Sequence, residues 1–134
     1  MRLALNTSRL GLVHGLAHPI GAVTGAAHGL LCGLLMPAVM RFNREAAGPK
    51  YRLLAQDLGL VPAAASEADG VEALIAWTEA TLERVRVPLR LSEVGFAPGD
   101  LDWIARETLP SGSTKANPRP VLQEEARAVA ASVL

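Results

Sequence analysis

The sequence predicts an all-α fold, a helical bundle of about six helices. Apolar residues recur at helical spacing, most clearly over residues 70–86, where acidic and basic residues take the opposite side. No segment shows the strict alternation of a half-buried strand. The run from Leu10 to Met40 contains no charged residue, which is typical of helices buried in the middle of a bundle. At 134 residues, the chain has the length of one domain.

The first third predicts two apolar helices joined by a short turn. Residues 1–17 carry a helical pattern from the start, and Pro19 is expected to kink or break this helix. Gly25-Ala26-Ala27 indicates a turn. A second apolar helix is expected over residues 28–42, with cationic residues near its C-terminal end, where they suit the helix dipole.

In the middle of the chain, predicted helices alternate with linkers. Gly48-Pro49 should open a separate helix, because proline suits the first turn, and Gly59 should end it. Residues 62–68 have the composition of a linker. Asp69 is the expected N-cap of the amphipathic helix over residues 70–86.

The C-terminal part predicts two more helices. Residues 89–95 form a compact connection with one short helical turn. Pro98 is expected to open a helix that reaches about Leu109. Residues 110–120 are rich in proline, serine and glycine and are expected to be a loop, followed by a last helix over residues 121–132.

Composition narrows the functional classes. Lys and Arg number 13, as do Asp and Glu, so the net charge is zero and nothing indicates a nucleic-acid partner. A single cysteine, Cys32, excludes an internal disulfide and is consistent with a cytoplasmic location. A lone cysteine among leucines and glycines is more often a small buried apolar residue than a nucleophile.

The uncharged run is long enough to raise the alternative of a membrane hairpin, since about 20 residues suffice for one crossing. Its three histidines, two prolines and six glycines argue against contact with lipid. A signal peptide is also disfavoured, because His14 and His18 interrupt the apolar stretch. A buried helix in a protein with no membrane partner explains the run better.

All three histidines of the protein lie between positions 14 and 28. His14 and His18 are four residues apart and would share one face of a helix. Imidazole is the commonest protein ligand of transition metals, so this segment is a candidate metal site. Without further information, a histidine in an apolar helix is more often a hydrogen-bonded core residue.

Taken as a whole, the segment is more specific. It reads His14-Gly-Leu-Ala-His18-Pro-Ile-Gly-Ala, then His28-Gly, then Leu-Met-Pro-Ala-Val-Met-Arg-Phe-Asn ending at Asn43. This pattern closely resembles the iron-containing (group III) alcohol dehydrogenase family. Residues 91–95 (Leu-Ser-Glu-Val-Gly) and 117–120 (Asn-Pro-Arg-Pro) resemble later segments of the same family, so the similarity covers essentially the whole chain.

The resemblance implies a function and a set of site residues. Family members join an N-terminal nucleotide-binding α/β domain to a C-terminal helical domain of the dehydroquinate synthase-like type. They bind NAD(P) and a divalent metal, usually Fe²⁺ and sometimes Zn²⁺, held by one Asp and three His. His14 and His28 match two of these metal ligands, and His18 matches a catalytic histidine concerned with proton transfer. The resemblance also implies a small alcohol or aldehyde substrate and a homo-oligomer.

The sequence departs from the family pattern at two points. Ala27 stands where the family often has proline, and this difference removes no metal-binding side chain. The Asp-x-x-x-His pair that completes the metal site, and the Gly-rich pyrophosphate loop, have no counterpart here, since no Asp precedes Asp57. We therefore expect residues 1–134 to form a single all-helical metal-binding domain from which the N-terminal nucleotide-binding domain is absent.

Two functions remain open at this point. In the first, the chain is the helical half of a metal-dependent NAD(P)-linked alcohol dehydrogenase, inactive alone and partnered by a complementary N-terminal half. In the second, it is a non-catalytic helical domain that serves for interaction or metal binding and derives from the same scaffold.

Overall fold

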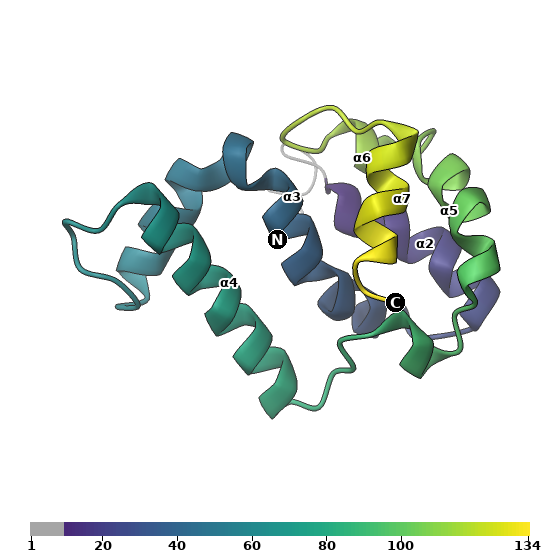
Figure 1. The fold of residues 1–134 in the computed structure, drawn as a ribbon, viewed down its shortest axis with the longest axis horizontal. Coiled ribbons are helices and arrows are strands. Elements are labelled where there is room, and N and C mark those ends of the chain that lie inside the picture. Colours follow the sequence, from purple (N-terminus) through teal and green to yellow (C-terminus); the bar gives the residue numbers. More distant parts are fainter. Residues whose placement is uncertain (1–9) are drawn as a thin grey trace.

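The computed structural model describes residues 10–134, and in this range every regular element is helical. There are six α-helices and two short 3₁₀ helices, which confirms the all-α fold (Figure 1). Of the helix predicted over residues 1–17, residues 1–9 lie outside the described residues, and the helix that the structure shows begins only at Leu12, with Gly11 as its N-cap. No described helix has both the length and the apolar character that a membrane crossing requires.

Helix α2 (Leu12–Thr24) runs without interruption through Pro19, so the predicted break does not occur. Proline has no N–H, which leaves the carbonyl of Gly15, four residues earlier, without its helical partner. The hydroxyl of Thr108, on α5, donates a hydrogen bond to this carbonyl at 3.4 Å. A side chain distant in sequence thus replaces the lost bond, and Pro19 itself is buried.

Helix α3 (His28–Asp57) is 30 residues long and passes through Pro37 and Pro49. The prediction of two separate helices, over residues 28–42 and from Gly48-Pro49 onward, is therefore wrong. Figure 1 shows that α3 bends along its length, as expected of a helix that contains prolines. It stays helical because residues on both sides of Pro49 are packed: Ala47 and Ala55 are both buried.

Helix α4 (Glu67–Arg84) packs along α3. The two helices approach closely, because a Cβ placed on Gly70 would lie 2.7 Å from the Cα of Arg52. The N-cap is Ser66, whose hydroxyl accepts from the Asp69 N–H at 3.1 Å, while the Asp69 carboxylate accepts from the Ser66 N–H at 3.3 Å. Asp69 is thus the third residue of the helix in a capping box, and its prediction as N-cap is wrong.

The C-terminal part follows the predicted order with one difference. The 3₁₀ helix η1 (Leu91–Val94) is the expected short turn, and η2 (Pro98–Asp100) leads into α5 (Leu101–Thr108). Helix α6 (Gly112–Lys115) is a single turn inside the segment predicted to be a loop, capped by the Ser111 hydroxyl. The last helix, α7, spans Gln123–Ala131.

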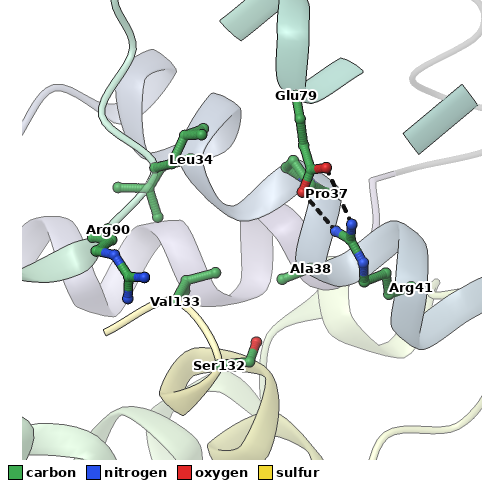
Figure 2. A pocket seen from close by; sticks show the side chains of 9 residues that line it. Leu34, Pro37, Ala38, Arg41, Glu79, Arg90, Ser132 and Val133 are labelled. Carbon is green, nitrogen blue, oxygen red and sulfur yellow. Dashed lines mark hydrogen bonds and ion pairs between the residues drawn. The ribbon is translucent and has the colours of Figure 1, made fainter. Parts of the chain in front are cut away.

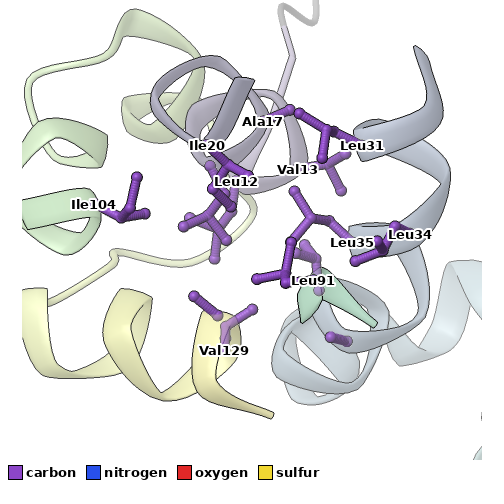
Figure 3. Close-up of a cluster of buried hydrophobic side chains, with 14 of the residues drawn as sticks. Leu12, Val13, Ala17, Ile20, Leu31, Leu34, Leu35, Leu91, Ile104 and Val129 are labelled. Atoms are coloured by element: carbon purple, nitrogen blue, oxygen red, sulfur yellow. The ribbon is translucent and has the colours of Figure 1, made fainter. Parts of the chain in front are cut away.

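The main hydrophobic core lies between α2, the first half of α3, η1, α5 and α7. Figure 3 shows side chains from these elements gathered around one centre. A second, smaller core joins α3 and α4. The fully buried large apolar side chains are Leu12, Leu16, Ile20, Leu31, Leu34, Leu35, Ile75, Leu91 and Ile104. Both cores contact α3, which therefore connects the two parts of the molecule.

A pair of asparagines ties the start of α2 to the rest of the fold. Asn43 and Asn117 exchange two hydrogen bonds, at 3.0 and 2.7 Å, between their side-chain amides. The Oδ1 atom of Asn117 also accepts from the Leu12 N–H at 3.2 Å. Gly11, at the N-cap, has no side chain to offer, so Asn117 satisfies an N–H of the first turn from a distant loop.

Candidate metal site

The turn between α2 and α3 brings the rings of His14 and His28 close together. Their ring centroids are 5.3 Å apart, and the ring planes are tilted by 55°. Gly25 adopts the left-handed conformation, with φ of 70°, which reverses the chain at the end of α2. The Thr24 hydroxyl accepts from the Ala26 N–H at 3.2 Å and fixes the turn.

The two rings differ in environment. His14 is partly buried, whereas His28 is exposed. The pKa of His14 lies below its ordinary value, because burial disfavours the imidazolium and because a protonated His28 would repel it. A neutral imidazole keeps the lone pair that a metal ion requires, so His14 is suited to ligation at neutral pH.

Cys32 lies beside His28, which the sequence analysis missed. Its Sγ atom is 3.4 Å from the Nε2 atom of His28, one helical turn away on α3. The side chain is partly buried rather than enclosed in the core, and burial raises the pKa of its thiol. The four-residue spacing from His28 was the signal that could have placed the two side chains on one face.

Together the three side chains form a cluster of donors. The ligand atoms of His14, His28 and Cys32 all lie within 4.8 Å of one another. Nitrogen and sulfur donors around a tetrahedral zinc ion would be about 3.5 Å apart, so the separations in this cluster are of the order that a shared ion requires. Among the described residues 10–134, no carboxylate side chain belongs to this cluster. Imidazole nitrogen and thiol sulfur are donor types that bind transition metals.

His18 lies outside this donor cluster. It follows His14 by one turn on α2, about 6 Å along the helix axis, and its side chain is exposed. The structure therefore brings together the two predicted metal ligands, and it leaves His18 accessible to a molecule that approaches the same side of α2.

The structure contains a pocket of about 410 Å³ whose lining includes no histidine (Figure 2). It lies between α3, α4 and the C-terminal end of the chain. Arg41 on α3 donates two hydrogen bonds to Glu79 on α4, at 2.8 and 3.1 Å, and this ion pair raises the pKa of Arg41. Because this ion pair joins two helices, we interpret both charged side chains as structural.

The chain is similar to proteins of known family. Residues 2–134 match the family model described as "Fe-containing alcohol dehydrogenase family, C-terminal". Lactaldehyde reductase of Escherichia coli K12 is 35% identical over 116 residues, which are 87% of this chain and 30% of that protein. The 1,3-propanediol dehydrogenase of Klebsiella pneumoniae is 29% identical over 127 residues, 95% of this chain and 33% of its own length.

Solved structures show the same helical arrangement. The alcohol dehydrogenase from Oenococcus oeni superposes with a TM-score of 0.93 at 29% identity, covering 99% of this chain and 35% of that one. A 1,3-propanediol oxidoreductase gives a TM-score of 0.93 at 28% identity, with coverage of 98% and 35%. The chain thus spans about a third of the length of the relatives that it matches. The helical fold and the match over nearly every residue establish that the chain belongs to the Fe-containing alcohol dehydrogenase family and corresponds to its C-terminal region.

Proposed function

We propose that this chain supplies the helical, metal-binding half of a metal-dependent NAD(P)-linked alcohol dehydrogenase. The observation that carries the proposal is the pairing of His14 with His28 at a ring separation of 5.3 Å, in a chain that belongs to an alcohol dehydrogenase family. The pattern of that family assigns metal ligation to these two positions.

In this proposal each histidine has a distinct role. His14 and His28 offer neutral nitrogen to a divalent metal, Fe²⁺ or Zn²⁺, which when bound polarises the oxygen of an alcohol or aldehyde. His18, exposed one turn after His14, exchanges a proton between the substrate and solvent. The partial burial of His14 keeps its nitrogen unprotonated at neutral pH.

The remaining parts of the enzyme would come from residues outside this sequence. We propose that residues 1–134 are a single all-helical domain, and that a nucleotide-binding α/β half, on the same or a separate polypeptide, supplies NAD(P) binding. That half would also supply the Asp and the third His of the metal site, which the donor cluster of this chain lacks. The names of the relatives make a small alcohol or aldehyde the proposed substrate.

The proposal extends to the cellular compartment and the oligomeric state. A reducing cytoplasm would keep Cys32 a free thiol, and we propose this compartment for the enzyme. A homo-oligomer is proposed on the resemblance to the family alone.

The first test is metal content. The purified chain should bind Fe²⁺ or Zn²⁺, and His14→Ala and His28→Ala should each lower the affinity at least about tenfold, because each removes a donor. His18→Ala is the matched control, since it changes a histidine of the same helix outside the cluster and should leave the metal bound. Metal binding that is unaffected by both ligand substitutions would refute the proposed site.

The second test is activity. Co-expression with a nucleotide-binding half of the same family should give alcohol-dependent reduction of NAD(P). His18→Ala should lower kcat by about 10²–10⁴-fold while metal content stays unchanged. A reconstituted pair that binds metal and NAD(P) but shows no activity with any small alcohol would favour the non-catalytic alternative.

A further inference from the structure

Cys32 completes a set of three donors that comes from this chain alone. Its sulfur is 3.4 Å from the Nε2 atom of His28, and both lie within 4.8 Å of the ligand nitrogen of His14. Because Cys32 and His28 are on the same helix and His14 is on another, a shared ion would link α2 to α3 at the turn that joins them.

We infer that the Cys32 thiolate is a third protein donor to the cation held by His14 and His28, and that this set takes Zn²⁺ in preference to Fe²⁺. The inference rests on the proposed function and specifies the metal chemistry of the same site. The pattern of family residues quoted above assigns no role to this position.

The physical reason lies in the softness of sulfur. Thiolate favours zinc, and imidazole suits zinc as well as iron, whereas oxygen donors favour harder ions. Zinc also lies above iron in the general affinity order of nitrogen and sulfur sites. Imidazole and thiolate are both established zinc ligands, and the Asp and third His proposed for the other half of the enzyme would add further donors to the same ion.

Coordination changes the protonation of Cys32. Binding forms one sulfur–metal bond and breaks the S–H bond, and the proton passes to solvent. No oxidant or reductant is needed.

The test uses Co²⁺ as a spectroscopic probe on the 134-residue chain in reducing buffer. Cobalt bound to a thiolate absorbs in the near ultraviolet through charge transfer from sulfur. Wild-type protein should show this band, and both Cys32→Ser and Cys32→Ala should lose it while keeping their helical circular dichroism. Met36→Leu is the matched control, because it removes an exposed sulfur one turn further along α3 and should keep the band.

Affinities give a second readout. Titration under anaerobic conditions should show that Cys32→Ser loses at least about tenfold in Zn²⁺ affinity and less in Fe²⁺ affinity. Cobalt binding that depends on His14 and His28, without the charge-transfer band and with equal Zn²⁺ affinity in both Cys32 variants, would overturn the inference and leave the proposed function intact. Absence of cobalt binding in wild-type protein would overturn both.

Discussion

Gly15 lies where three helices meet, and its lack of a side chain makes that contact feasible. A Cβ atom added at this position would lie 1.9 Å from the Oγ1 atom of Thr114 on α6. Thr114 is buried, and its hydroxyl has no hydrogen-bond partner among the described residues 10–134. Packing against Thr114 thus requires a residue without a side chain next to His14, the proposed metal ligand.

Gly15→Ala should destabilise the protein by about 1–3 kcal/mol, because the added methyl group forces Thr114 to move within a packed interior. Urea unfolding followed by circular dichroism measures the change. Gly29→Ala is the control: no atom lies within 4 Å of a Cβ added there, so the same substitution should be neutral or slightly stabilising. Adding Thr114→Ala to Gly15→Ala should recover part of the loss, and a double variant that is no more stable than Gly15→Ala would contradict this explanation.

At the scale of the element, the ends of helices depend on nearby residues, whereas the tolerance of prolines inside helices depends on the surrounding packing. The end of α2 at Gly25 and the beginning of α4 at Ser66 depend on residues within a few positions, so their sequence signals are local. Pro19 and Pro37 lie inside continuous helices because the surrounding packing outweighs the lost hydrogen bond.

Ser66→Ala should cost about 0.5–2 kcal/mol, since it removes the hydroxyl that caps the Asp69 N–H at the start of α4. The measurement is the midpoint of urea unfolding. Ser92→Ala, at an exposed serine of η1, provides the comparison and should change stability by less than about 0.5 kcal/mol. Equal effects of the two substitutions would show that the capping box does not stabilise α4.

At the scale of the whole molecule, the loop before α7 holds α2 against α3. Asn117 accepts hydrogen bonds from Leu12 and Asn43 and donates to Asn43 and to the carbonyl of Arg119. These contacts join segments 74 to 105 residues apart in sequence. They anchor the helix that carries His14.

Asn117→Ala should destabilise the protein by about 2–3 kcal/mol, because the buried amide of Asn43 and the Leu12 N–H lose their partner. The increase in the rate of backbone amide hydrogen exchange should be larger at the first turn of α2 than at the centre of α4. Gln123→Ala, which shortens an exposed amide side chain at the start of α7, should leave both stability and exchange unchanged. Exchange that rises uniformly over all helices would argue against a specific anchoring role.

Sequence alone determined the helical class, the left-handed glycine Gly59 that follows the C-cap of α3, and the resemblance of the histidine segment to a known family. Periodicity, left-handed turns and motifs are properties of neighbouring residues. The likeness of residues 14–43 to a known family pointed to His14 and His28, and tertiary structure brought their rings together. Only tertiary structure decided that α3 continues through Pro49 and that the Gly15 carbonyl accepts from Thr108. It also placed Cys32 within reach of His14. These features depend on contacts between segments far apart in the chain, where packing supplies more free energy than local propensity.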